Sequence, residues 1–174
     1  MGSAANDDGR GAGRPALRLL EPPDLAGAER GGTGSVERSM RSHPAGARRR
    51  LVLHVSGDQT GRILFSRIAR RWENLRLLAV DGARSGLTMA TQRRPDLVVV
   101  DAHLTDADGE ETVIRLRQEL RPDDVPIVVL GDDPSPAARA RFVWAGASAY
   151  VTKPLVIAEI DRTVGELLEV AALR

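Results

Sequence analysis

The sequence predicts a doubly wound α/β domain, in which one parallel sheet carries helices on both faces. Short apolar runs recur from residue 51 onward, and they cover residues 51–55, 75–80, 97–100, 126–130 and 147–151. Their apolar character is continuous rather than alternating, which suits strands that are buried on both faces of a parallel sheet. Longer amphipathic stretches separate the runs, and strands that alternate with helices imply right-handed βαβ units.

The intervening stretches are predicted to be helices. Residues 60–72, 108–120 and 156–172 carry apolar side chains every three or four positions, as an amphipathic helix does. In the first of these, Leu64 and Ile68 are expected to face the sheet. Five strands and five helices in this alternation fit the flavodoxin-like strand order 2-1-3-4-5 best, and that order places a site at the carboxyl ends of the strands.

Residues 1–47 differ in composition from the rest of the chain. They hold 9 of the 17 glycines and 4 of the 10 prolines, and they contain no aromatic residue. Such a stretch cannot bury enough apolar surface to offset its ordering entropy. It is predicted to be a disordered N-terminal tail, which leaves residues 48–174 as the folded domain.

Composition excludes several classes of protein. The chain has no cysteine, which excludes disulfides and thiolate metal sites, and its formal net charge of +1 gives no strong electrostatic reason to bind nucleic acid. No apolar run approaches the roughly 20 residues that a membrane helix needs. We therefore expect no membrane and no nucleic acid among the partners, and a cytoplasmic location.

Two charged residues stand at predicted strand ends. Asp101 follows the run 97–100, where a carboxylate can act as a nucleophile toward a phosphoryl donor, or can simply cap the following loop. Lys153 is the single lysine among 25 basic residues, and it follows the fifth run. It is expected to point toward Asp101 and to neutralise a carboxylate or phosphoryl oxygen, with a solvated surface lysine as the alternative.

Three segments together resemble the receiver domain of two-component response regulators, the CheY-like superfamily. They are PDLVVVDAHLTDADGEE from Pro95, AGASAYVTKPL from Ala145 and LVLHVSGDQTGR from Leu51. The resemblance implies that residues 48–174 are a receiver domain with Asp101 as its phosphoacceptor. It also implies that Lys153 pairs with the phosphoryl group or with Asp101, and that Tyr150 is the aromatic switch residue. The alternative for Tyr150 is a half-buried surface tyrosine.

Two positions depart from the receiver pattern. Receivers usually carry two adjacent acids after the first strand to hold Mg²⁺, but here those positions read Ser56-Gly57, with Asp58 one place later. Mg²⁺ prefers hard oxygen ligands, so it is expected to bind weakly, through Asp101 and Asp58, if it binds at all. Asp58 is otherwise a helix N-cap. Gly131 stands where receivers usually have Thr or Ser to bind the phosphoryl group.

Three hypotheses for the function follow. The first is a phosphorelay receiver that acts by protein contact, is not an enzyme and has no DNA-binding output domain, with a histidine kinase or phosphotransfer protein as its partner. The second is a pseudo-receiver, an interaction module that is independent of phosphate and acts on another protein target. The third is a small flavodoxin-like nucleotide-binding protein, against which the absence of G-x-G-x-x-G and Walker patterns argues.

The resemblance also suggests a surface for partners or for a second copy in a homodimer. It is the face built from the fourth helix, the fifth strand and the fifth helix. Its members would be Arg139, Arg141, Trp144, Tyr150, Glu159 and Arg162. Trp144 is predicted to belong to the core, with an exposed docking anchor as the alternative.

Overall fold

A computed structural model describes residues 49–120 and 125–173, so the predicted tail over residues 1–47 lies outside the described residues. The described part contains one parallel sheet in the order β2-β1-β3-β4-β5, which confirms the predicted strand order. Its strands are β1 (Arg50–Val55), β2 (Leu75–Val80), β3 (Leu97–Asp101), β4 (Ile127–Gly131) and β5 (Ala149–Thr152).

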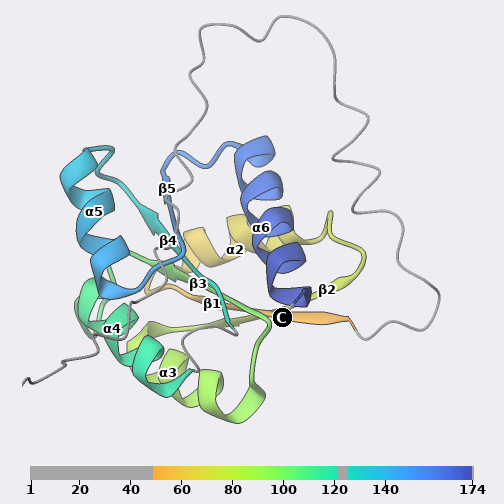
Figure 1. The fold of residues 1–174 in the computed structure, drawn as a ribbon, viewed down its shortest axis with the longest axis horizontal. Coiled ribbons are helices and arrows are strands. Elements are labelled where there is room, and N and C mark those ends of the chain that lie inside the picture. The colour runs from red at the N-terminus through yellow and green to blue at the C-terminus, as the bar shows by residue number, and fades with distance from the viewer. Residues whose placement is uncertain (1–48, 121–124, 174) are drawn as a thin grey trace, which may run out of the picture. The chain divides into compact units, whose positions relative to one another are not determined.

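Helices cover both faces of the sheet. They are α2 (Gln59–Ala69), α3 (Gly82–Arg93), α4 (Gly109–Glu119), α5 (Pro136–Ala145) and α6 (Ile157–Ala172). α2 and α6 lie on one face, and α3, α4 and α5 lie on the other (Figure 1). None of the described helices is long and apolar enough to cross a membrane.

The continuous apolar runs exist because the central strands face two cores. In β3, Val98 and Val100 pack with the three-helix face, whereas Leu97 and Val99 pack with the two-helix face. All residues of β3 and β4 are buried. Complete burial of a side chain such as valine or leucine contributes about 1.5–3 kcal/mol, so these strands hold both layers on the sheet.

Two predicted core residues are not in the core. Leu64 is 51% exposed, because α2 turns Phe65, Ile68 and Ala69 toward the sheet instead. Trp144 is 87% exposed, so its assignment to the core was wrong. α5 buries Ala138 and Phe142, and a residue two positions after Phe142 lies about 200° further round the helix, on the solvent side.

Candidate functional site

Asp101 lies where the topology predicts a site. It is the last residue of β3, between β1 and β4, and it is only 3% exposed. Lys153 follows β5 directly, and its Nζ lies 3.5 Å from Oδ1 of Asp101. The prediction that this lysine and this aspartate meet at one rim of the sheet is confirmed, although their chemical roles stay predictions.

Ser56 contributes the hydrogen bond that the sequence did not reveal. Its Oγ donates to Oδ2 of Asp101 at 2.5 Å, from the position directly after β1. The hydroxyl therefore occupies one carboxylate oxygen, while Lys153 stands near the other. A serine at the carboxyl end of the neighbouring strand was the available signal, since strands β1 and β3 are paired there.

His54 lies behind the carboxylate, inside β1. Its Nε2 is 3.9 Å from Oδ1 of Asp101, which is beyond hydrogen-bond distance. Neither ring nitrogen has a hydrogen-bond partner within the described part of the chain. The ring packs on Phe65 with 4.4 Å between centroids, so His54 is part of the packing behind the carboxylate.

Opposing effects set the charge state of Asp101. Burial raises the pKa of this carboxyl group, whereas the adjacent imidazole of His54, the hydrogen bond from Ser56 and the ammonium of Lys153 lower it. The lowering prevails, so the pKa of Asp101 lies below its ordinary value. At neutral pH the group is a carboxylate, which is the form a nucleophile needs.

Asp58 is a helix cap. Its carboxylate accepts hydrogen bonds from the backbone N–H groups of Thr60 at 2.9 Å and Gly61 at 2.8 Å, at the start of α2. Of the two roles predicted for it, the geometry bears out the N-cap. Within residues 49–120 and 125–173, no group of three or more His, Asp or Glu side chains is placed to hold a metal ion. Both candidate ligands are thus engaged within the protein, Asp58 with the backbone of α2 and Asp101 with Ser56, whereas Mg²⁺ requires several oxygen ligands.

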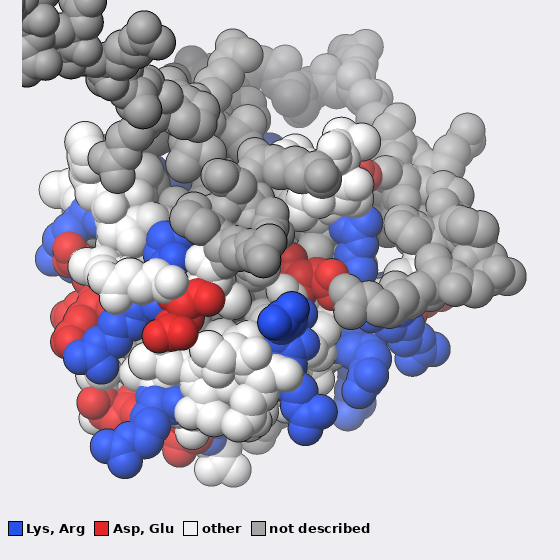
Figure 2. Space-filling view, turned by 60° about the horizontal axis from the view of Figure 1, so that its bottom comes forward, with Lys and Arg blue, Asp and Glu red and all other residues white. Residues whose placement is uncertain are grey.

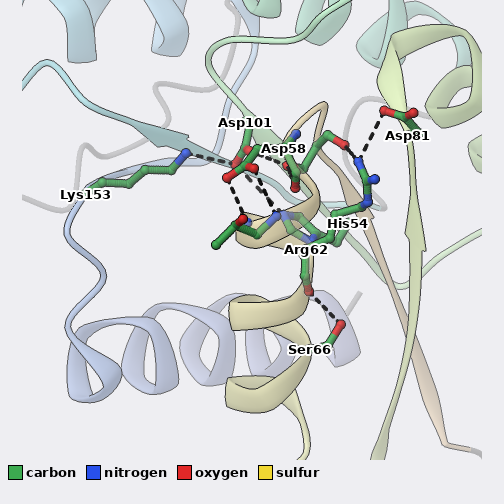
Figure 3. A network of polar contacts seen from close by, with 10 residues as sticks. His54, Asp58, Arg62, Ser66, Asp81, Asp101 and Lys153 are labelled. Atoms are coloured by element: carbon green, nitrogen blue, oxygen red, sulfur yellow. Dashed lines mark hydrogen bonds and ion pairs between the residues drawn. The ribbon is translucent and has the colours of Figure 1, made fainter.

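A further ion pair ties the site to α2. One guanidinium nitrogen of Arg62 donates to the backbone oxygen of Ser56 and lies 3.2 Å from the carboxylate of Asp81, just after β2 (Figure 3). Sequence reasoning did not find this link, because it joins a helix to the ends of two strands.

Tyr150 is buried rather than half-buried, so the surface alternative was wrong. The residue is 3% exposed, and its hydroxyl donates to the backbone oxygen of Asp133 at 2.8 Å. Its ring stacks on Phe142 with 5.5 Å between centroids. Burial raises the pKa of Tyr150, and the nearby charge of Asp133 adds to this effect.

Gly131 makes the position of Tyr150 possible. A Cβ atom added to Gly131 would lie 2.0 Å from the hydroxyl oxygen of Tyr150 and 2.4 Å from its Cζ, which is far inside van der Waals contact. The tyrosine ring therefore fills the space that a side chain at residue 131 would need. The ring and any side chain at 131 exclude each other.

Comparison with known proteins gives matches over the described domain. A family model for the response regulator receiver domain matches residues 52–164. The transcriptional regulatory protein PrrA of Mycobacterium tuberculosis is 41% identical over 90 residues, which is 52% of this chain and 37% of that protein. The KDP operon transcriptional regulatory protein KdpE of Escherichia coli is 34% identical over 110 residues, or 63% and 47% of the two chains. The chain thus spans less than half the length of these curated relatives.

Solved structures agree on the fold. The signal receiver domain of a putative LuxO repressor protein from Vibrio parahaemolyticus superposes with a TM-score of 0.66 at 22% identity, covering 72% of this chain and 94% of that one. A CheY-like receiver domain protein from Methanospirillum hungatei gives 0.64 at 22% identity, covering 71% and 96%.

Proposed function

Because the chain belongs to the family of response regulator receiver domains, we propose that it is a signalling module whose output surface keeps one state whether or not Asp101 carries a phosphoryl group. It acts by contact with another protein. This is the pseudo-receiver hypothesis in a more specific form.

The proposal rests on the close approach of the Tyr150 ring to Gly131. In receivers that follow the usual pattern, a Thr or Ser at this strand end binds the phosphoryl group and signals its presence. Here Gly131 has no hydroxyl, and the ring of Tyr150 already fills the space beside it. A phosphoryl group on Asp101 would therefore have no side chain at residue 131 to bind, and the ring of Tyr150 would keep its position.

The surroundings of Asp101 support the same proposal. Ser56 and Lys153 already satisfy the two carboxylate oxygens. Phosphoryl transfer depends mainly on positioning and on neutralising charge with metal ions and cations. With Asp58 capping α2, we expect Mg²⁺ to bind weakly and phosphorylation to be slow.

A phosphorelay receiver is the second candidate, and one observation favours it. The pKa of Asp101 is lowered and Lys153 stands 3.5 Å away, so a nucleophilic carboxylate and a cation for the phosphoryl oxygens are both in place. In that function a carboxylate oxygen would attack the phosphorus of a phosphohistidine partner, and the histidine nitrogen would leave with its electron pair. The partner would be a histidine kinase or phosphotransfer protein.

Several finer statements stay predictions. The matched relatives are by name regulators of transcription, so the absence of nucleic acid and of an output domain is untested for this chain. The cytoplasmic location and a homodimer through α5, β5 and α6 are untested as well. No observation on the described residues favours the nucleotide-binding alternative.

Incubation of the full chain with acetyl phosphate and Mg²⁺ tests the proposal, with Asp101→Asn as the control. Intact mass reports the adduct, and ring resonances of Tyr150 report the output surface. We expect little or no adduct, and unchanged Tyr150 resonances in any phosphorylated fraction. A stoichiometric adduct on Asp101 that shifts the Tyr150 resonances would overturn the proposal in favour of the phosphorelay.

A further inference from the structure

The edge strand β2 is incompletely covered on the face that carries α2 and α6. Five strands about 4.8 Å apart span about 19 Å between the outer axes. Two helices, each at least about 10 Å wide, can barely cover that width. Leu75 and Leu77 are accordingly only partly buried, and Ala79 is exposed, whereas the residues of the central strands are fully buried.

An open depression lies between α2 and this strand, and we call it the basic groove. It consists of two adjoining hollows that share Ser66 and Arg70. Three apolar residues of β2 line it, and we call them its floor. Four arginines also line it, and we call them its rim. The floor residues are Leu75, Leu77 and Ala79, the arginines are Arg49, Arg62, Arg67 and Arg70, and the acidic residue among the lining residues is Glu73.

The rim arginines differ in how they are engaged. Arg62 is held by Ser56 and Asp81. Arg67 and Arg70 are both exposed, and neither has an ion pair with an acid among the described residues. Residues three positions apart in a helix are neighbours on its surface, so the two guanidinium groups border the groove together.

Charge on the surface is unevenly distributed in general. In the face drawn in Figure 2, basic groups gather toward the right-hand side, while acidic and basic groups alternate on the left. A formal net charge of +1 for the whole chain therefore conceals local excesses of positive charge. The basic groove is one such excess, and it is combined with uncovered apolar surface.

We propose that the basic groove binds an acidic segment of a partner protein, one that carries an apolar side chain between its carboxylates. Guanidinium groups bind carboxylates in a bidentate manner, and charged rims steer the encounter of the partners. The apolar floor favours such a segment over duplex nucleic acid, whose phosphate backbone offers charge but no apolar group to cover Leu75 and Leu77. The proposal rests on the proposed function, since it names the surface through which protein contact occurs.

The groove adjoins the Asp101 site through one residue. Arg62 lines the groove and also donates to the backbone oxygen of Ser56, whose hydroxyl bonds Asp101. A segment bound in the groove therefore lies next to the site without entering it, and binding needs no phosphoryl group. Because the groove and the Asp101 site are separate, the proposal for the groove and the proposal for the response to phosphorylation can be tested independently.

Fluorescence anisotropy with the full chain and a labelled peptide of alternating Glu and Leu residues tests the groove. The variant is Arg67→Gln with Arg70→Gln, and the matched control is Arg84→Gln with Arg93→Gln, which removes the same charge from exposed positions on α3. We expect the groove variant to bind about ten-fold more weakly, and the control to change by less than about two-fold, since each lost carboxylate contact contributes only modestly at an exposed site.

Three further measurements make the outcome decisive. A peptide with Ser in place of Leu should bind more weakly than the Glu-Leu peptide, and amide shifts on binding should map to α2 and β2.

Equal weakening by both variant pairs would mean that net charge alone is responsible, and would overturn the proposal. Duplex DNA or anionic phosphatidylserine vesicles that bind as tightly, with the same dependence on Arg67 and Arg70, would overturn the assignment to a protein segment. An absence of binding by the Glu-Leu peptide would also overturn the proposal, and would leave the acetyl phosphate result unaffected.

Discussion

Substitution of Gly131 by alanine tests the relation between residue 131 and Tyr150 most directly. The added Cβ would stand 2.0 Å from the hydroxyl oxygen and 2.4 Å from Cζ of the ring. The neighbour cannot yield by a small shift, because the ring lies against Phe142 and its hydroxyl is bonded to the backbone of Asp133. We therefore expect Gly131→Ala to drive the ring out of its site.

The size of the effect follows from what the ring loses. Removing an aromatic side chain from a buried site costs about 2 kcal/mol in transfer free energy. The hydrogen bond to Asp133 contributes about 1 kcal/mol, and the stacking on Phe142 about 0.5–1 kcal/mol. Alanine in a strand recovers about 0.5–1 kcal/mol relative to glycine. The free energy of unfolding should fall by about 2.5–3.5 kcal/mol.

A double-mutant cycle separates this clash from other effects of the substitution. In the Tyr150→Ala background the space beside residue 131 is open, so Gly131→Ala should be neutral or stabilising by about 0.5–1 kcal/mol. The same substitution should thus change sign between the two backgrounds. The gain from alanine cancels in the cycle, so the coupling free energy should be about 3.5–4 kcal/mol, which is slightly above the usual range for residues in contact.

Urea denaturation gives the free energies, and alkaline absorbance titration gives the position of the ring. Tyr150 is the single tyrosine of the chain, so the tyrosinate absorbance reports on it alone. Its raised pKa stabilises the fold below the unfolded value of about 10, and this contribution is lost as the pH rises through the folded value. Gly131→Ala should return the pKa toward its ordinary value. A loss below about 1 kcal/mol with an unchanged titration would refute the reasoning.

Two further substitutions test the rest of the site. Asp101→Asn should lower the free energy of unfolding by about 1–2 kcal/mol at pH 7, because Lys153 loses its partner. The pKa of Asp101 is lowered in the folded state. The difference in free energy of unfolding between wild type and variant should therefore be constant above the unfolded pKa of about 3.9, and should shrink as the pH falls through the folded pKa. Urea denaturation midpoints measured across this pH range check the expectation. Asp58→Ala should cost about 1 kcal/mol through loss of the α2 cap and should leave that pH dependence intact; a changed pH dependence would show that Asp58 acts on the Asp101 carboxylate.

The sheet was predictable because its strands carry their own signal. The runs at β3 and β4 are apolar on both faces, and only a central parallel strand requires that. The faces of the helices were less certain. Leu64 and Phe65 are adjacent in sequence, and both lie at helical spacing from Ile68, so the pattern alone did not decide which one faces the sheet. The exposure of Trp144 could have been predicted from its position relative to Ala138 and Phe142, which are the residues that α5 buries.

The site was predictable where strand ends meet and unpredictable where side chains compete for space. Asp101 ends β3 and Lys153 follows β5, so topology alone brings them to one rim. The exclusion between Gly131 and Tyr150 depends on the register of β4 and β5, in which Gly131 is paired with Thr152, and on which way the ring turns. The spacing of residues in the sequence does not predict the orientation of the Tyr150 side chain.

The two departures from the receiver pattern are consistent with each other in physical terms. An acid at position 56 would place a second carboxylate beside Asp101, and without a metal ion the two would repel. Ser56 instead donates a hydrogen bond to Asp101, and with Lys153 it stabilises the unphosphorylated carboxylate. At the other strand end, Gly131 leaves room for Tyr150, whose ring is held by Phe142 and Asp133. In the proposed function, the residues at 56 and 131 that remove the response to a phosphoryl group are therefore also the ones that stabilise the unmodified domain. An acid at 56 alone would introduce a repulsion, and a hydroxyl side chain at 131 alone would introduce a clash.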